Sequence, residues 1–289
     1  MKKPENLKLA GVVVLYNPDH TVLDNIDTYI NEVDLLYVMD NSEKINDLLI
    51  SEIKAIDKVC YKSNQRNLGI ASALNIASYS AITDGFQILL TMDQDSSFKK
   101  GDVKVLLDYY VELTKGLNIG IVCPYHGNKN IRTPRFRKKY RMVRTAMTSG
   151  NIVNLDAFKV AGGFNEELFL DYVDHEFCLR LRKNKFLIVL INSIVLNHNQ
   201  GAISYHKLLG RKIYTTNHEA KRRYYITRNR LFVIKKYASF DFYFIMKDVK
   251  DLFAETIKIL LYEKDKKNKI QQIFMGFSDF LKNKYGKLS

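Results

Sequence analysis

The chain of 289 residues has only three cysteines and no long uninterrupted apolar run. Cys60, Cys123 and Cys178 are widely separated and odd in number, so they match neither metal-ligand spacing nor a disulfide framework. Because Cys60 and Cys123 lie in strand-like apolar runs, we expect both to be buried free thiols in a reducing compartment. No stretch reaches about 18 consecutive apolar residues, so we expect no transmembrane helix and only peripheral membrane contact.

Two nucleotide-binding signatures are also missing. The sequence contains neither G-x-G-x-x-G nor G-x-x-x-x-G-K-[ST], which disfavours dinucleotide sites and P-loop sites.

The N-terminal stretch MKKPENLKLAGVVV has an apolar run that is too short and mixed for a secretory signal, so we expect none. With 46% apolar and 26% charged residues, the composition is that of a globular protein rather than a disordered or fibrous one.

Positive charge is in excess and is concentrated in two places. The formal net charge is +14. Residues 218–289 carry 17 lysines and arginines against eight acids, and Lys129–Arg144 carries eight lysines and arginines and no acid. Such a surplus indicates an anionic partner: nucleic acid, an anionic membrane surface or a phosphate-bearing substrate.

Strand-like and helix-like segments alternate over the first 125 residues. Expected strands are Leu9–Tyr16, Leu35–Met39, Lys58–Lys62, Gln87–Met92 and Ile119–Cys123; expected helices are Thr21–Glu32, Ile45–Ile56, Ile70–Ile82 and Asp102–Lys115. This alternation predicts an α/β fold with a mostly parallel, doubly wound sheet. Ligands of such sheets bind beyond the carboxyl ends of the strands, where Asn17, Asp40 and the Asp93/Asp95 pair lie in this sequence.

The second half has a different pattern. Tyr172–Lys183 is typical of a helix, and Phe186–Ile191 and Ile194–Leu196 are typical of two strands. From Glu219 onward three amphipathic helical stripes follow one another. We therefore expect a basic helical region over residues 218–289, which would form an interface with a membrane surface or with another subunit.

Two acidic groups could carry chemistry. Asp93 and Asp95 flank one residue directly after an apolar strand, and two carboxylates that close favour a divalent cation between them. Short acidic turns are also common before helices, so a solvated turn remains the alternative. Asp174 would lie in the first turn of a helix and could deprotonate a hydroxyl nucleophile, although plain helix capping is the more common role of such an acid.

Three further features are open between a functional and a structural interpretation. His198 could be a third metal ligand, although a lone histidine is more often a surface or hydrogen-bonded residue. Asn67 and Gly69 could bring backbone N–H groups to a nucleotide at a helix start. Lys129–Arg144, with interleaved aromatic residues, could bind single-stranded nucleic acid, bind lipid phosphates or be a solvated loop.

Seven segments, in this order, resemble the family 2 inverting glycosyltransferases with the GT-A fold. They are VVVLYNPD (Val12–Asp19), MDNSE (Met39–Glu43), NLGIASALNIA (Asn67–Ala77), LLTMDQDSSF (Leu89–Phe98), TSGN (Thr148–Asn151), GGFNEELFLDYVDHEFCLRL (Gly162–Leu181) and NHNQG (Asn197–Gly201). Within that family the chain looks most like the bacterial rhamnosyltransferases of surface-polysaccharide assembly, including their later stretch KRRYYITRNRLFVIKKY (Lys221–Tyr237). The resemblance implies a GT-A catalytic domain over residues 1–217, with a nucleotide-sugar half of about 1–125 and an acceptor half of about 126–217.

The resemblance also implies roles for individual residues. Donor contacts fall on Asn17, Asp40, Asn67, Gly69, Asp93 and Gln94, and acceptor contacts on Asn151, Asp171 and Glu176. Asp93, Asp95 and His198 match the metal site for Mg²⁺ or Mn²⁺, and Asp174 matches the catalytic base. Asp171, three residues earlier, could also reach the acceptor; the motif favours Asp174.

The implied reaction is a single inverting displacement at the anomeric carbon. The expected donor is dTDP-β-L-rhamnose, and the expected acceptor is a saccharide or a polyprenyl-pyrophosphate-linked saccharide at the inner face of a bacterial cell membrane. Asp93, Asp95 and Asp174 should then converge on one cavity. The C-terminal helices would bind an anionic membrane surface or form a homodimer.

Other functions remain possible from the sequence. Galactofuranosyl transfer from UDP-galactofuranose shares the same motif order. A haloacid-dehalogenase-type phosphatase also uses a D-x-D, but it expects Thr or Val where Ser97 lies and places that strand first in the chain. A nucleic-acid-binding protein would explain the net charge, yet no helix-turn-helix, zinc finger or RNP motif is visible. A catalytically inactive nucleotide-sugar-binding partner is the last alternative.

Overall fold

The computed structural model describes residues 7–127, 138–198, 204–208 and 211–288. The chain forms two compact units, Met1–Asn165 with Phe177–Asn199, and Glu166–Glu176 with Gln200–Ser289. The second unit is therefore built from two separated stretches of sequence. Among the described residues, no helix is long and apolar enough to cross a membrane.

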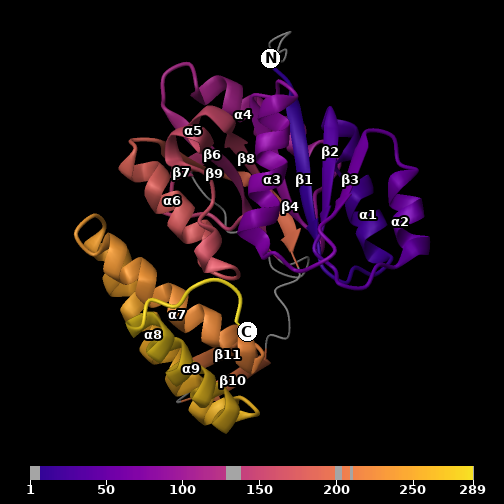
Figure 1. Ribbon diagram of the computed structural model, residues 1–289. Helices are drawn as coiled ribbons and strands as arrows, with labels where there is room; N and C mark the ends of the chain where they lie inside the picture. Colours follow the sequence, from indigo (N-terminus) through magenta and orange to yellow (C-terminus); the bar gives the residue numbers. More distant parts are fainter. Residues whose placement is uncertain (1–6, 128–137, 199–203, 209–210, 289) are drawn as a thin grey trace. The chain divides into compact units, whose positions relative to one another are not determined.

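The first unit contains a mostly parallel sheet (Figure 1). Its strands are β1 (Leu9–Leu15), β2 (Leu35–Asp40), β3 (Val59–Ser63), β4 (Ile88–Asp93), β5 (Ser96–Ser97), β6 (Ile119–Gly127), β7 (Tyr140–Met142), β8 (Asn151–Asn154) and β9 (Leu187–His198). The order is β3-β2-β1-β4-β8-β6-β9-β5, with β7 beside β9. The pairs β1/β2, β2/β3, β1/β4 and β6/β9 are parallel, while β8 is antiparallel to both of its neighbours.

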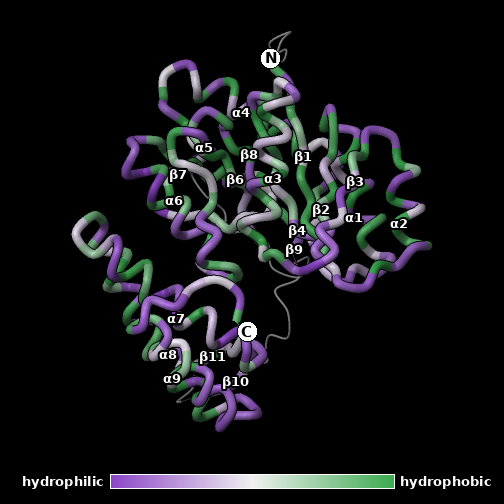
Figure 2. Tube along the Cα trace, in the orientation of Figure 1, coloured by the Kyte–Doolittle hydropathy of each residue, from purple (hydrophilic) through white to green (hydrophobic). Residues whose placement is uncertain are grey.

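Helices lie on both faces of this sheet. They are α1 (Thr21–Asp27), α2 (Asp47–Lys54), α3 (Ile70–Thr83), α4 (Asp102–Leu113), α5 (Leu155–Ala161) and α6 (Val173–Lys183), and α6 passes from the second unit into the first. Apolar side chains of α1, α2 and α4 form one core with alternate strand residues such as Val13 and Leu90. Alanines of α3, including Ala73 and Ala77, are fully buried and allow close packing on the sheet. Figure 2 shows the hydrophobic strands running through the middle of this unit. The expected doubly wound α/β fold is therefore confirmed.

The structure corrects several local expectations. The helix that begins at Thr21 ends at Asp27, because the Thr28 hydroxyl and backbone N–H both bond to the Asn25 carbonyl; a 3-10 turn, Ile30–Glu32, follows. The two strands expected after Phe186 are one strand, β9, whose pairing with β6 shifts register at Asn192–Ile194. Cys60 is exposed rather than buried because β3 is an edge strand, whereas Cys123 is buried as expected.

The second unit is a helical cluster with a small hairpin. It contains β10 (Ser204–Leu208), antiparallel to β11 (Arg211–Thr215), and the helices α7 (Ala220–Tyr237), α8 (Phe242–Tyr262) and α9 (Lys266–Leu281). A 3-10 turn, Glu166–Leu168, opens the other stretch of this unit. Phe169 stacks on Tyr225 of α7 with ring centroids 5.2 Å apart, so the two stretches share one core.

Candidate active site

The carboxyl ends of β1, β2 and β4 meet at one edge of the sheet. Leu15 pairs with Asp40 and Val14 pairs with Asp93, so the three strands end nearly level. Asn17 follows β1 with a positive φ of 48°, and its backbone N–H donates to the Ser42 hydroxyl (2.7 Å). The expected gathering of Asn17, Asp40 and Asp93 at the strand ends is therefore present in the fold.

Asp93, Asp95 and His198 form a cluster in the first unit. One ligand atom from each lies within 4.8 Å of the others. The short strand β5 causes this proximity, because Ser96 pairs with His198 across β5 and β9. The Asp95 side chain is 44% exposed and that of His198 12%, and His198 Nδ1 lies 3.3 Å from Asp95 Oδ1. Two carboxylates and an imidazole suit a divalent cation such as Mn²⁺ or Mg²⁺, so these residues fit the expected metal site.

Three residues that sequence reasoning missed hold this cluster. The Ser149 hydroxyl accepts the backbone N–H of Asp93 (3.0 Å), and the Ser96 hydroxyl bonds to His198 Nδ1 (2.8 Å). His126 Nε2 bonds to the Ser149 carbonyl (2.8 Å), which fixes the loop that carries the Ser149 hydroxyl. Ser149 belongs to the TSGN stretch that the family resemblance includes, and that motif was the only signal that could have indicated it.

Gln94 links two strand ends. Its side-chain oxygen accepts from the Tyr16 N–H (2.8 Å), and its amide donates to the Tyr16 carbonyl (3.2 Å). The Gln94 carbonyl in turn accepts from Asn25 (2.8 Å). These bonds tie the loop after β4 to the loop after β1, and the expected donor contact of Gln94 remains a prediction.

Asp40 is buried, with 1% of its surface exposed. One carboxylate oxygen accepts the Ser42 N–H (2.8 Å) and the other accepts the Tyr61 hydroxyl (2.8 Å). Burial, together with this bond to Asp40, raises the pKa of Tyr61 well above its usual value, so the phenol stays a donor. Asp40 is thus held rigidly beside the loops after β1 and β2, while its expected base contact is still a prediction.

Asn67 and Gly69 shape the start of α3. Gly69 has φ 84° and ψ 163°, a conformation that residues with a Cβ rarely adopt, and its N–H donates to Asn67 Oδ1 (2.9 Å). Asn41 donates to the Gly69 carbonyl (3.1 Å), so this turn is tied to the end of β2. The N-cap residue of α3 is Gly69, which has no side chain that could bond the first N–H groups of the helix.

The acceptor residues expected from the sequence are mostly engaged inside the protein. Asn151 is 3% exposed and its amide donates to the Met147 carbonyl (2.7 Å). Glu176 is fully buried and accepts from the Tyr237 hydroxyl (2.7 Å) and from Lys236 (2.9 Å). These contacts give both residues a structural role, and their expected acceptor contacts stay predictions.

Asp171 and Asp174 differ sharply in their surroundings. Asp171 forms a two-pronged ion pair with Arg222, with N···O distances of 2.9, 3.1 and 3.3 Å. Burial raises the pKa of Asp171, and the facing Arg222 guanidinium opposes that rise. Asp174, in the first turn of α6, is half-buried and accepts the His175 N–H (2.7 Å), and no ion pair to it occurs among the described residues.

The site residues are divided between the two units. Asp93, Asp95 and His198 lie in the first unit and Asp171, Asp174 and Glu176 in the second, so the convergence of Asp93, Asp95 and Asp174 stays a prediction. Residues 129–137 of the basic loop Lys129–Arg144 lie outside the described residues.

Comparisons with known proteins agree with this architecture. The model of the family "Glycosyl transferase family 2" matches residues 12–169. The dTDP-rhamnosyl transferase RfbF of Shigella flexneri is 28% identical over 283 residues, 92% of each chain.

Solved structures share the fold. TarS 1-349 of S. aureus in complex with UDP-GlcNAc superposes with a TM-score of 0.63 at 12% identity, over 96% of this chain and 82% of that one. GalNAc-T7 with UDP, GalNAc and Mn²⁺ superposes with a TM-score of 0.60 at 14% identity, over 81% of this chain, which spans about half (48%) of GalNAc-T7. Because the family model covers more than half of the sequence and the fold agrees, the chain belongs to glycosyl transferase family 2 and is a glycosyltransferase with the GT-A fold.

Proposed function

We propose that this enzyme transfers L-rhamnose from dTDP-β-L-rhamnose to a saccharide acceptor in cell-surface polysaccharide synthesis, with inversion and with a divalent cation. Similarity to RfbF over nearly the whole of both chains supports this donor, because RfbF is described as a dTDP-rhamnosyl transferase. The cluster of Asp93, Asp95 and His198 supports the metal dependence. That cluster is the observation on which the proposal most depends.

The chemistry follows from the charges that develop. A divalent cation, when bound, would offset the negative charge of the departing diphosphate. Asp93, Asp95 and His198 would hold it. The acceptor oxygen forms a bond to the anomeric carbon while the bond from that carbon to the diphosphate oxygen breaks, and the nucleoside diphosphate leaves with the electron pair. The carboxylate of Asp174 takes the proton from the acceptor hydroxyl.

Asp174 suits the role of base better than Asp171. A base must be free to approach the hydroxyl that it deprotonates. The Asp171 carboxylate is occupied by Arg222, whereas Asp174 has no such cation among the described residues. Asp174 also lies at the start of α6, where the helix dipole stabilises a carboxylate.

A transfer assay with paired variants tests the proposal. Purified enzyme with Mn²⁺ is given dTDP-β-L-rhamnose, UDP-galactofuranose or UDP-GlcNAc, with a panel of decyl glycosides as acceptors, and the release of nucleotide and the mass of the product are measured. We expect dTDP-rhamnose to be used best. We also expect Asp174→Asn to lower kcat at least about 100-fold, the scale of losing one general base. The Asp171→Asn variant should retain more transfer activity than the Asp174→Asn variant.

Two outcomes contradict parts of the proposal. If the enzyme uses UDP-galactofuranose best, its donor is UDP-galactofuranose and not dTDP-β-L-rhamnose. Full transfer by Asp174→Asn together with none by Asp171→Asn would move the base to Asp171. A matched variant, Asp57→Asn, removes an exposed carboxylate of the first unit and serves as the control.

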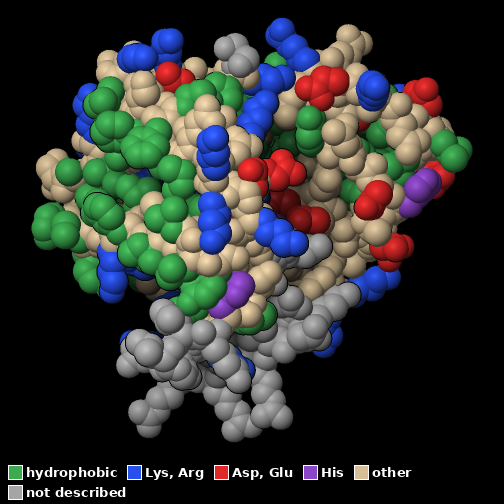
Figure 3. Space-filling model, turned by 90° about the horizontal axis from the view of Figure 1, so that it is seen from below, with side chains coloured by type: hydrophobic (Ala, Val, Ile, Leu, Met, Phe, Trp, Pro, Cys, Tyr) green, Lys and Arg blue, Asp and Glu red, His purple; other side chains and the backbone are tan. Residues whose placement is uncertain are grey.

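We also propose that the face of α8 and α9 binds the anionic inner surface of a bacterial cell membrane, where a polyprenyl-pyrophosphate-linked acceptor would lie. Large apolar side chains of both helices are exposed; they are Phe242, Tyr243, Met246, Phe253, Ile257, Leu260 and Leu261 on α8, and Phe274, Phe277 and Leu281 on α9. Figure 3 shows hydrophobic side chains gathered over these C-terminal helices, with lysine and arginine side chains beside them.

The charges of the same helices favour lipid over a second copy of the chain. Two acids of α8 and the acid that directly follows the helix pair with cations of the same unit. Asp248 and Glu255 pair with Arg230, and Glu263 pairs with Lys269. Lysines, among them Lys250 and Lys258, accompany the apolar residues on α8. Two copies of such a face would repel each other, whereas lipid phosphates would attract the face. A second copy of the chain is therefore a less favoured partner for this face than an anionic membrane.

A further inference from the structure

Polar residues of α7 recur at intervals of seven. One series is Arg222, Asn229 and Lys236, and the next is Arg223, Arg230 and Tyr237. Seven residues are nearly two helical turns, so each series lies along one stripe of the helix. All of these residues except Arg223 bond to the segment 166–176, which contains Asp174. The proposed transfer mechanism assigns no role to this pattern.

The segment 166–176 has an unusual backbone. Phe169, Asp171 and Tyr172 have φ values of 56°, 60° and 65°, in the left-handed region that residues with side chains seldom occupy. Three such residues within four positions persist only when surrounding contacts determine the conformation. Most of those contacts come from α7, and Asp248 of α8 adds one to Tyr172.

Asn229 is the centre of these contacts. It is fully buried, and its Nδ2 donates to the carbonyls of Leu168 (2.6 Å), Leu170 (2.7 Å) and Asp171 (3.0 Å). Arg228 Nε donates to Asn229 Oδ1 (3.0 Å), which orients the amide so that its N–H groups face the segment. One side chain thereby bonds three carbonyls of the strained stretch.

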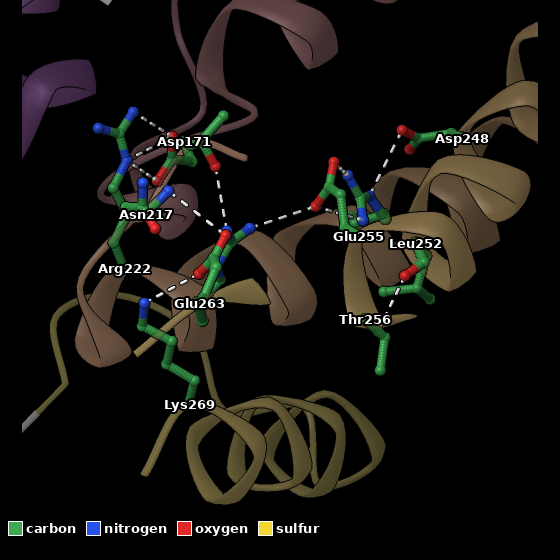
Figure 4. A network of polar contacts seen from close by, with 12 residues as sticks. Asp171, Asn217, Arg222, Asp248, Leu252, Glu255, Thr256, Glu263 and Lys269 are labelled. Atoms are coloured by element: carbon green, nitrogen blue, oxygen red, sulfur yellow. Dashed lines mark hydrogen bonds and ion pairs between the residues drawn. The ribbon is translucent and has the colours of Figure 1, made fainter. Parts of the chain in front are cut away.

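Two arginines hold the side chains of the same stretch. Arg222 pairs with the Asp171 carboxylate at 2.9 Å (Figure 4). Arg230 Nε donates to the Tyr172 hydroxyl, which donates to Asp248 (2.7 Å), and Arg230 is itself held by Glu255 (3.0 Å). Burial raises the pKa of Tyr172 well above its usual value, so this hydroxyl remains a donor.

The far end of the segment is held by the last turn of α7. The buried carboxylate of Glu176 accepts from Tyr237 (2.7 Å) and Lys236 (2.9 Å). Bonds from α7 thus hold residues on both sides of Asp174, at positions 168–172 and at 176. The Asp174 carboxylate is left out of this network and has a half-buried surface.

From these contacts we infer that α7 positions the catalytic base, and that Asn229 is its principal positioning residue. The inference rests on the proposed role of Asp174. Asn229 fixes the backbone that leads into the first turn of α6, and Glu176 anchors that turn from its other side. The KRRYYITRNRLFVIKKY motif accordingly serves the chemistry of the acceptor half through the backbone, and it does so without touching either substrate.

The test compares variants of the full chain in the dTDP-rhamnose assay with Mn²⁺ and decyl glycosides. Asn229→Leu keeps the branching and the number of heavy atoms of the side chain and removes the three bonds; Tyr237→Phe removes the bond to Glu176 at the other end. We expect Asn229→Leu to lower kcat about 10- to 100-fold, the scale of a misplaced catalytic group, and Tyr237→Phe to lower it less. The KM for dTDP-rhamnose and its affinity in Mn²⁺ should stay within about twofold, because the metal cluster belongs to the other unit.

Arg223→Met provides the matched control. Arg223 is a buried residue of the same helix that bonds to Thr216, Glu255 and Glu263 and not to the segment. The Arg223→Met variant should lower the thermal unfolding midpoint about as much as Asn229→Leu does, and it should leave kcat near the wild-type value. Equal kcat for Asn229→Leu and Arg223→Met would overturn the inference.

Two further arms separate this inference from the proposed function. If Asn229→Leu does not fold, Tyr237→Phe becomes the deciding variant. An unchanged kcat for Tyr237→Phe would then overturn the inference. If Asp174→Asn is inactive while the α7 variants are fully active, only the positioning inference fails. If Asp174→Asn transfers at the wild-type rate, the base assignment fails, and the inference fails with it.

Discussion

Asp93, Asp95 and His198 come together through backbone pairing rather than through nearness in sequence. Asp93 is the last residue of β4, and the two-residue strand β5 places Asp95 beside His198 at the end of β9. Ser149 bonds the backbone N–H of Asp93 and Ser96 bonds the ring of His198, so these hydrogen bonds hold the main chain at Asp93 and orient the imidazole. A cation that binds here would meet a site that needs little rearrangement.

At this residue scale we predict that metal binding depends mainly on the carboxylates. In Mn²⁺ titrations followed by thermal shift, Asp93→Asn or Asp95→Asn should abolish the Mn²⁺-dependent rise of the unfolding midpoint, because an amide cannot offset the cation's charge. His198→Gln should weaken binding about 10-fold, the lower end of what losing a supporting ligand costs. An equal Mn²⁺ shift in wild type and Asp93→Asn would place the metal elsewhere; Asp57→Asn is the control.

The sequence allowed some of these residues to be predicted but not others. Asp40 and Asp93 could be located because uninterrupted apolar runs mark the strands that they end. Ser149 and Ser96 lie within two of the motifs but were not singled out, because a serine has many ordinary roles and the hydrogen bond between Ser149 and Asp93 spans 56 positions. Asn151 and Glu176 were assigned to the acceptor by resemblance, and their burial depends on packing that no local pattern encodes.

At the scale of elements, α7 departs most from what its sequence indicates. A run so rich in lysine and arginine is typical of a solvated surface, yet Arg223, Arg228 and Arg230 are each at most 4% exposed. They can be buried because each meets carboxylates or carbonyls: Arg230 pairs with Asp248 and Glu255, and Arg228 bonds to the Gly286 carbonyl (2.8 Å). The net positive charge of the C-terminal region therefore overstates the charge at its surface.

His218, just before α7, should make this region sensitive to acid. Burial, and then the charges of Arg222, Arg223 and Lys269, lower the pKa of His218 to about 3. Between the ordinary value near 6.5 and that folded value, the unfolded chain binds the extra proton, so stability falls as the pH falls through this window. Between pH 7 and pH 5 the loss is at most about 2 kcal/mol.

The prediction is that His218→Gln reduces this acid-induced loss. Urea unfolding at pH 7 and pH 5, followed by far-UV circular dichroism, measures the change in free energy for wild type and variant. His20→Gln, which alters a histidine whose side chain is 59% exposed, is the control. An identical pH dependence in wild type and His218→Gln would show that this histidine does not couple stability to pH.

At the scale of the whole molecule, charge and exposed apolar surface predict where the enzyme works. The chain has a net charge of +14, and the α8/α9 face combines lysines with exposed aromatic residues. Co-sedimentation of the full chain should show binding to vesicles of phosphatidylcholine with phosphatidylglycerol, and little binding to phosphatidylcholine alone. Raising NaCl from 50 to 500 mM should weaken the binding, because salt screens the attraction.

A double variant with a matched control identifies the face. Phe253→Ser and Phe274→Ser together should lower the vesicle affinity about 10-fold or more, since each removes a buried apolar group from the lipid interface. Leu48→Ser is the matched control, because Leu48 of α2 is 66% exposed, as is Phe253. If the double variant instead turns a dimer into a monomer and no vesicle is bound, a second copy of the chain occupies this face.

The separated make-up of the second unit has a consequence for biosynthesis. Residues 166–176 are translated well before Asn229 and Tyr237, and the Gly286 N–H that bonds to the Glu167 carbonyl (2.7 Å) is translated later still. A nascent chain on the ribosome can complete its first sheet while this stretch still has no partner. Translation that stops before α7 would leave a polypeptide that carries Asp93, Asp95 and His198 but lacks the helix that holds the stretch 166–176, so the proposed activity would arise only after α7 has left the ribosome.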